Sequence, residues 1–392
     1  MDKINKIIFF IESPYNQRDH GRFGIALLEN NGFVVEVWEF TPFLHPEVHE
    51  QVKVSDPITY NKHFIFNSKR EALNAILKIK DRTFIVFFMG YYFKAYGIFR
   101  AVSKKNLKYA TFMANALPLP VSNQSHNKGI ANILKRIKKI TPNKLSNYMF
   151  PRVPFKLLGI KPATFNLAGG EESNHYAYPI DSNTKTLWLH SLDYDLYLDN
   201  KEKPNEIDND VGVFLDEYLP FHPDYLHSGL PAASSPEEYY PLLCNFFDFI
   251  ENKYHVKIII AAHPRSRYEE YPDYFGGREV IRGQTIELVK KSTFVILHSS
   301  TSINFAILFK KPCIFITTEK IQLSYMGTFI NNMSYLLGKT PILLDKNFVI
   351  NWDEELKIDE RAYKNYRNAY IKKDGTQELP FWQMFANELK QL

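Results

Sequence analysis

Short apolar runs alternate with stretches of helical periodicity along most of the chain. In the first half the candidate strands are 6–13, 34–40, 63–67, 83–90 and 109–114. Apolar residues three and four apart predict helices between them at 21–30 and 69–79. A second series of candidate strands follows Gly169 and Gly170, at 186–191, 211–219, 256–264, 279–283, 294–300 and 312–318. Because strands that alternate with helices are typical of parallel sheets, the pattern predicts an α/β chain with two doubly wound domains.

The predicted architecture is two Rossmann-like domains with a cleft between them. A length of 392 residues exceeds what one compact core usually serves. We place the first domain at 1–180 and the second at 181–358, followed by two closing helices at 359–392. Residues from about 115 to 165, rich in Pro, Asn, Lys and Gly, are predicted to form an insertion in the first domain.

Composition favours a soluble globular protein. Hydrophobic residues make up 45% of the chain and charged residues 23%, which is atypical of disordered and of membrane-spanning proteins. Cys244 and Cys313 lie inside apolar stretches, which predicts buried thiols in a reducing compartment and hence a cytoplasmic protein. The dinucleotide-binding, Walker A, HExxH and Gly-x-Ser-x-Gly motifs do not occur, which disfavours oxidoreductase, NTPase, zinc-protease and hydrolase functions.

The net charge of +5 is distributed unevenly. From Arg82 to Gly170 there are 15 Lys and Arg and no Asp or Glu, so the rest of the chain carries a charge of −10. The segment IANILKRIKKI (130–140) has helical apolar spacing, with four cations on its other side: Lys135, Arg136, Lys138 and Lys139. This predicts a basic amphipathic helix that holds the protein at the inner face of the cytoplasmic membrane by contact with anionic lipid. A solvated surface helix and an oligomer surface also fit; nucleic acid is not expected as a partner because no DNA- or RNA-binding motif accompanies the charge.

Polar residues follow several predicted strands, where ligands of open α/β sheets bind. In FVILHSSTSINF (294–305) an apolar run gives way to His298, Ser299, Ser300 and Thr301 before helical spacing resumes. Hydroxyl groups and free N–H groups at the start of a helix suit a phosphate, although they also suit simple helix capping.

Two other strand ends carry groups that could act in catalysis. The strand at 256–262 runs into His263 and Pro264, followed by Arg265 and Arg267, and Arg and His side chains suit a leaving phosphate. The strand at 211–215 runs into Asp216 and Glu217, either of which could serve as a general base. A structural histidine and a capping or ion-paired carboxylate are the plainer alternatives.

The acidic pair, the His-Pro dipeptide and the Ser/Thr-rich turn, in this order, resemble motifs of the bacterial sialyltransferases and polysialyltransferases. These are inverting glycosyltransferases of the GT-B architecture, and some bacterial Kdo transferases share related features. The resemblance implies that Asp216 deprotonates the acceptor hydroxyl and that His263 binds the phosphate and assists its departure. It also implies that Ser299, Ser300 and Thr301 bind the phosphate of a cytidine monophosphate donor. The whole sequence further resembles proteins encoded beside surface-polysaccharide genes.

The chain departs from that family in two ways. The acidic motif of the family ends in Gly, whereas Tyr218 follows here. Asp216 lies in the predicted second domain, although a GT-B base usually comes from the first. Glu12 and Asp19, which flank the first strand-to-helix turn, are therefore alternative bases.

Asp193 and Asp195 have the Asp-x-Asp spacing by which some transferases hold a divalent cation. We nevertheless predict a site without metal, because a complete α/β pattern precedes them and a CMP-type donor departs through one phosphate. His190 and Ser191 are predicted to line the cleft beside Asp193 and to bind the donor, with helix capping as the alternative.

The sequence therefore predicts a metal-independent GT-B glycosyltransferase of capsule or lipopolysaccharide biosynthesis. Its donor would be a CMP-linked nonulosonic acid or Kdo, with no other cofactor, and its acceptor a lipid-linked or other oligosaccharide. Inversion is what the resemblance implies, but related Kdo enzymes can retain, so the stereochemistry stays open. Alternatives are another donor, namely a UDP- or GDP-sugar, CDP-glycerol or phosphoribosyl diphosphate, and a non-catalytic GT-B scaffold in polysaccharide assembly.

Overall fold

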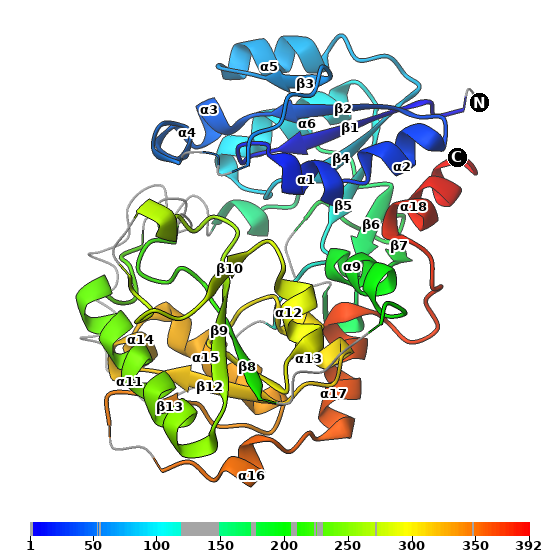
Figure 1. Cartoon of the computed structure of the whole chain (residues 1–392). Helices are drawn as coiled ribbons and strands as arrows, with labels where there is room; N and C mark the ends of the chain where they lie inside the picture. The colour runs from blue at the N-terminus through cyan, green and yellow to red at the C-terminus, as the bar shows by residue number, and fades with distance from the viewer. Residues whose placement is uncertain are drawn as a thin grey trace, which may run out of the picture.

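Two parallel sheets, each covered by helices on both faces, form two α/β domains (Figure 1). The prediction of two such domains is confirmed. The computed structural model describes residues 3–52, 54, 56–118, 149–173, 178–204, 210–222, 225, 230–270, 273–346 and 349–392. The predicted basic helix with Lys135, Arg136, Lys138 and Lys139 lies outside the described residues.

The first sheet has the strand order β3-β2-β1-β4-β5-β6-β7, and its neighbouring strands are parallel. Its strands are β1 (Lys6–Ile11), β2 (Val34–Glu39), β3 (His63–Ile65), β4 (Thr83–Phe88), β5 (Lys108–Phe112), β6 (Phe165–Ala168) and β7 (Lys185–Trp188). Its main helices are α1 (Gln17–Arg22), α2 (Ile25–Asn30), α3 (Thr41–Leu44), α4 (Pro46–Gln51), α5 (Lys69–Ile76) and α6 (Tyr96–Lys104).

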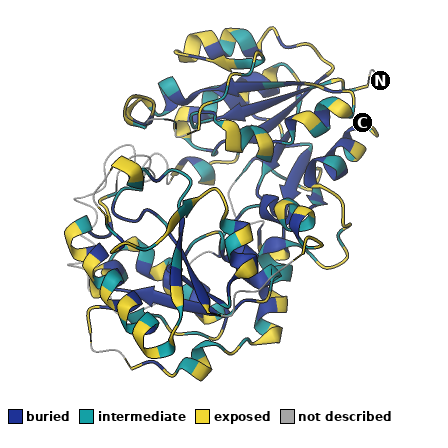
Figure 2. Ribbon diagram, viewed as in Figure 1, coloured by how far each residue is buried: buried dark blue, intermediate teal, exposed yellow. Residues whose placement is uncertain are grey.

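Burial on both faces explains why these strands are almost wholly apolar. In β1, Phe9 packs into the core beneath α2, and Phe10 packs on the opposite side with α5 and α6. Successive side chains of a strand point to opposite faces, so a strand covered on both sides needs apolar residues throughout. Figure 2 shows the central strands buried and the outer faces of the helices exposed, whereas the edge strand β3 is largely exposed.

The second sheet has the order β10-β9-β8-β11-β12-β13, again with parallel pairs. Its strands are β8 (Val211–Leu215), β9 (Lys257–Ala262), β10 (Val280–Arg282), β11 (Phe294–Leu297), β12 (Cys313–Thr317) and β13 (Ile342–Leu343). Helices α11 (Pro236–Tyr254), α14 (Glu319–Leu323) and α15 (Tyr325–Leu336) cover one face. The other face is covered by α9 (Leu192–Asn200), α12 (Thr285–Lys291), α13 (Ile303–Leu308) and α17 (Glu360–Tyr366).

The assignment of the run at 186–191 to the second domain, which begins at 181 in the predicted division, is wrong. This run forms β7, which pairs with β6 in the first sheet, with Phe165 opposite Lys185. Strand β6 was not predicted, because its four residues lie next to the polar segment interpreted as an insertion. The chain therefore completes the first sheet after that segment and crosses to the second domain through α9.

The C-terminal helix α18 (Phe381–Leu389) returns to the first domain, whereas α17 packs on the second (Figure 1). Trp382 of α18 packs edge-to-face against Phe9 and donates its indole N–H to the Arg22 carbonyl at 2.6 Å. Gly24 lies beneath this ring, where a Cβ would come within 2.3 Å of the indole, and its φ of 56° separates α1 from α2. This is why the helix predicted at 21–30 is two short helices.

Every helix in the described part of the chain is too short or too polar to span a bilayer.

Candidate active site

The loops that follow β8, β9 and β11 line one cavity of about 300 Å³. Its polar lining comes from Glu217, His222, His263, Ser299, Ser300 and Thr301. Its apolar and aromatic lining comes from Leu117, Leu219, Tyr225, Tyr325, Met326 and Phe329. The cavity therefore brings His263, Glu217 and the hydroxyl turn together, as the strand-end argument predicts, and adds an apolar part that the motifs did not indicate.

His263 follows β9 and contributes its ring to the polar part of the cavity. The backbone N–H of Arg265 donates to Nδ1 of His263 at 3.2 Å, so a neutral ring carries its proton on Nε2 and can donate from there. Burial, followed by the charges of His222, Arg265 and Arg18, holds the pKa of His263 well below its usual value. The ring is therefore a neutral hydrogen-bond donor at pH 7 until an anion binds beside it.

Asp216 lies beneath the His263 loop and is 3% exposed. One carboxylate oxygen accepts the N–H of Tyr218 at 2.9 Å, and the other accepts the N–H of His263 at 3.1 Å. The hydroxyl of Tyr268 donates to both oxygens, at 3.0 and 3.1 Å. Burial raises the pKa of Asp216 to about 6. These contacts are those of a group that fixes a loop, and they leave little room for the acceptor hydroxyl that the predicted base must reach.

Glu217 points instead toward the hydroxyl turn. Its carboxylate accepts the backbone N–H of Ser299 at 2.5 Å and the Ser299 hydroxyl at 3.1 Å. Burial raises the pKa of Glu217 to about 7. Glu217 thus anchors the turn after β11, while Ser300 and Thr301 line the cavity beside it.

Three residues predicted to bind the donor lie in the core instead. His298 is fully buried, and its ring nitrogens bond to the Tyr239 hydroxyl at 2.8 Å and the Ile316 carbonyl at 2.7 Å. His190 is also fully buried and bonds to the carbonyls of Ser191 and Leu379. Ser191 is buried beside it. The predicted donor contacts of His298, His190 and Ser191 do not fit these positions, because all three side chains are enclosed in the core and none lines the cavity at His263.

The two arginines after His263 have different surroundings. Arg267 forms an ion pair with Glu270 within its own loop. Arg265 lies close enough to the cleft for its charge to act on His263 and on Asp19 of the first domain. Of the two, Arg265 is the one whose charge reaches the polar part of the cavity.

The carboxylates of the first domain differ in how fully they are bonded. Glu12 accepts hydrogen bonds from the Gly90 N–H at 2.8 Å and the Tyr92 hydroxyl at 2.6 Å, and its carboxylate lies 3.1 Å from Nε2 of His45. Burial opposes its ionisation, but these bonds prevail and lower the pKa of Glu12. Asp19 of α1 accepts no hydrogen bond on its carboxylate from the described residues, and burial raises its pKa against the charges of Arg18, Arg22 and Arg265.

The Asp-x-Asp pair does not converge on one point. Asp193 pairs with Arg22 at 2.6 Å and accepts from the Asn304 amide at 3.0 Å, which joins α1, α9 and α13. Asp195 accepts the backbone N–H of Phe381 at 2.9 Å. Within the part of the chain that the structure describes, no cluster of three metal-ligating side chains occurs.

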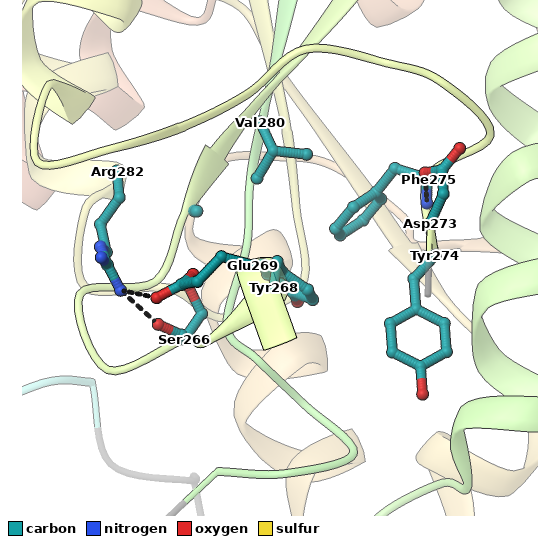
Figure 3. A pocket seen from close by; sticks show the side chains of 9 residues that line it. Ser266, Tyr268, Glu269, Asp273, Tyr274, Phe275, Val280 and Arg282 are labelled. Carbon is teal, nitrogen blue, oxygen red and sulfur yellow. Dashed lines mark hydrogen bonds and ion pairs between the residues drawn. The ribbon is translucent and has the colours of Figure 1, made fainter. Parts of the chain in front are cut away.

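A further cavity of about 490 Å³ lies beside the loop that follows β9, away from the hydroxyl turn (Figure 3). Figure 3 shows Arg282 donating to the Ser266 carbonyl and to Glu269. Asp273 also lines this cavity and accepts from the backbone of Phe275. Its acidic groups and its engaged arginine make it a poorer phosphate site than the cavity at His263.

Similarity to solved structures is detectable by shape rather than by sequence. CalG4, the calicheamicin glycosyltransferase, superposes with a TM-score of 0.52 at 10% identity, covering 99% of this chain and 98% of that one. The chain therefore has the GT-B fold. MurG of Acinetobacter baumannii covers 99% of this chain and 100% of its own, with a TM-score of 0.46 and 10% identity. The match to the UDP-GlcNAc 2-epimerase of Methanocaldococcus jannaschii covers 92% of this chain and 98% of that one, with a TM-score of 0.43 and 15% identity.

No protein-family model matches the sequence, and no curated protein is significantly similar to it. The predicted GT-B architecture is confirmed, whereas the resemblance to sialyltransferases and Kdo transferases stays a prediction.

Proposed function

We propose that the chain is a glycosyltransferase whose nucleotide donor binds in the cavity at His263. The observation that carries the proposal is the pairing, in one cavity, of a polar part with an apolar, aromatic part. The polar part offers His263, Ser300 and Thr301 to a phosphate, and the aromatic part offers Tyr225, Tyr325 and Phe329 to a nucleobase. A volume of about 300 Å³ is at the small end for ligand pockets and suits a mononucleotide.

The proposed reaction is a direct displacement at the anomeric carbon of the donor sugar. The acceptor oxygen forms a bond to that carbon as the bond to the donor phosphate breaks, and the nucleotide departs with the bonding electrons. Negative charge grows on the phosphate, where the Nε2–H of His263 and the hydroxyls of Ser300 and Thr301 can donate to it. The proton leaves the acceptor hydroxyl for a carboxylate.

We assign that carboxylate to Asp19 and assign Asp216 to positioning the His263 loop. The carboxylate oxygens of Asp216 and Glu12 already accept hydrogen bonds from neighbouring groups, whereas the Asp19 carboxylate accepts no hydrogen bond from the described residues. The charge of Arg265 acts on both Asp19 and His263, so the proposed base and the proposed phosphate site share one electrostatic partner. A raised pKa also makes the ionised Asp19 carboxylate a stronger proton acceptor.

The proposed donor is a CMP-linked nonulosonic acid or Kdo, and the proposed role is capsule or lipopolysaccharide synthesis. The motif order supports the donor, and the mononucleotide-sized cavity fits one phosphate better than two. A UDP- or GDP-sugar, CDP-glycerol or phosphoribosyl diphosphate would keep the reaction type and change only the leaving group. A scaffold without activity would not need to bind a nucleotide at all.

Thermal shift measurements with CMP, CDP, UDP, GDP and phosphoribosyl diphosphate, with and without magnesium, test the proposal. CMP is expected to raise the melting temperature without metal, because saturation at 100 times Kd stabilises by roughly 2.7 kcal/mol. The shift should vanish in His263→Ala and persist in His49→Ala, an exposed histidine on α4. A larger shift with another nucleotide would overturn the CMP assignment, and no shift with any compound would favour the scaffold.

We also propose that the first domain docks on an anionic membrane surface. Exposed apolar side chains gather around Phe150, including Phe93 at 57% and Met149 at 50% exposure, and Leu157 nearby is 80% exposed. Cations accompany them, and no acid occurs in the sequence from 82 to 170. Apolar side chains among cations are the composition that binds the interface of anionic bilayers.

Changing Lys135, Arg136, Lys138 and Lys139 together to Glu is expected to abolish binding to phosphatidylglycerol liposomes in a flotation assay. A matched reversal of exposed second-domain lysines should leave binding intact: Lys253, Lys291, Lys357 and Lys364. Equal binding by both variants would contradict the docking proposal.

A further inference from the structure

A second cavity, of about 610 Å³, lies between the two domains. Arg18 and Arg22 of α1 line one side, Asp193 and Asp199 of α9 another, and the loops after β9, β10 and β11 the rest. The cavity adjoins the donor cavity, because Thr301 lines both and the neighbours His263 and Pro264 line one each. A molecule bound here would lie beside the proposed phosphate site.

Most charged groups of this cavity already have partners. Arg22 pairs with Asp193 at 2.6 Å, and Asp195 accepts the N–H of Phe381 at 2.9 Å. Arg282 donates to the Ser266 carbonyl at 2.7 Å and to Glu269 at 3.2 Å. These groups hold the walls of the cavity in place and are not available to a ligand without breaking those contacts.

Arg18 differs from them. Among the described residues none accepts a hydrogen bond from its guanidinium and none forms an ion pair with it within 4 Å. The Arg18 side chain is exposed to solvent, but the protein around its guanidinium, followed by the charge of Arg22, lowers its pKa to about 10, so it is still a cation at neutral pH. The positive charge of Arg265, from the opposite domain, also lowers the pKa of Arg18, whereas the negative charges of Asp19 and Asp193 raise it. A guanidinium in this setting is a ready partner for an anion, with which it can form two parallel hydrogen bonds.

The rest of the lining suits hydroxyl groups. Asp199 accepts no hydrogen bond from the described residues, and Gln17, Thr285 and Ser302 also line the cavity. Carboxylates accept hydrogen bonds from sugar hydroxyls and amides both accept and donate, but several carboxylates repel a ligand that is anionic along its whole length. Of the three arginines that line the cavity only Arg18 has no partner among the described residues, and four carboxylates line it too, so it matches a ligand with a single anionic group and several hydroxyls.

We propose that this cavity is the acceptor subsite and that Arg18 selects an acceptor whose terminal sugar carries one carboxylate or phosphate. The inference rests on the proposed glycosyltransferase function, because only that function requires a second substrate beside the donor cavity. Arg18 and the proposed base Asp19 are consecutive residues of α1, and of the two only Arg18 lines this cavity. The acceptor is therefore an acidic or phosphorylated glycan rather than a neutral one.

Saturation-transfer NMR on the full chain tests the subsite with glucuronate, glucose 1-phosphate and glucose as probes at physiological salt. The anionic probes are expected to bind about tenfold more tightly than glucose or better, as one charge-assisted bidentate contact implies. A stronger glucuronate signal would identify a carboxylate acceptor, and a stronger glucose 1-phosphate signal a phosphorylated one. Arg18→Gln should remove the preference, and Arg70→Gln, an exposed arginine on α5, should keep it.

Nucleotide binding measured in the same samples separates this inference from the proposed function. If the chain binds a nucleotide but shows no preference for anionic sugars, the subsite alone is overturned. The same holds if the preference survives Arg18→Gln. An Arg18-dependent preference without binding of any nucleotide would overturn the acceptor role together with the transferase function. Folding of each variant is checked by its melting temperature, and Arg18→Lys should restore part of the preference by keeping the charge.

Discussion

Replacing Asp19 with asparagine is expected to lower kcat by roughly 10²–10⁴-fold, the usual contribution of a general base, and to leave nucleotide affinity unchanged. Asparagine has nearly the same shape but cannot accept the acceptor proton. The donor cavity is lined by residues of other segments, so its affinity does not depend on this carboxylate. The measurement is the steady-state rate of sugar transfer, with nucleotide affinity determined by calorimetry on the same preparations.

The pH profile gives the same assignment a second test. A base must be ionised to act, so wild-type activity should fall as the pH drops through the raised pKa of Asp19. Asp19→Asn should lose this acid limb from its residual activity. Glu12→Gln is the matched control, because Glu12 lies near the same strand end but is bonded to Gly90, Tyr92 and His45. A larger loss of kcat in Glu12→Gln than in Asp19→Asn would transfer the role of base to Glu12.

Replacing Asp216 with alanine is expected to lower the free energy of unfolding by about 2–4 kcal/mol and to weaken nucleotide binding. The change leaves the N–H groups of Tyr218 and His263 and the hydroxyl of Tyr268 without their acceptor, and each buried unsatisfied donor costs about 1–3 kcal/mol. Nucleotide affinity falls because the His263 loop loses the group that holds its backbone. Urea unfolding and calorimetry measure the two effects.

Two variants sharpen this prediction. Tyr268→Phe removes one donor and should cost about 1 kcal/mol without affecting the His263 backbone contact. Asp216→Asn keeps an acceptor and should be milder than alanine. Abolished turnover in Asp216→Asn, with stability and nucleotide affinity both intact, would restore Asp216 as the base and contradict the positioning role.

Periodicity alone predicted most of the architecture, because strands buried on both faces are apolar throughout and stand out from helices. The exceptions were strands too short for that signal. Strands β6 and β13, of four and two residues, were missed, and β7 was placed in the wrong sheet. Neither length nor composition says which sheet an isolated run of four residues will join, since that depends on distant pairing.

The site was predictable as far as it depends on strand ends. His263, Glu217 and Ser299 meet because parallel strands deliver their carboxyl ends to one edge. The motif could not show that His298 turns into the core while Ser299 turns toward the cavity, since that depends on the phase of the pleat. It also could not reveal Tyr325 and Phe329, which lie on a distant helix, or Arg18, which reaches the cleft only because of how the domains meet.

The most direct test of the central claim is a crystal structure of the chain with CMP, or with the nucleotide that stabilises it most. We expect a phosphate within hydrogen-bond distance of His263 and of Ser300 or Thr301, and a nucleobase against Tyr225, Tyr325 or Phe329. A nucleotide bound instead beside Arg282, in the cavity of Figure 3, or with its phosphate on Arg18 would contradict the assignment.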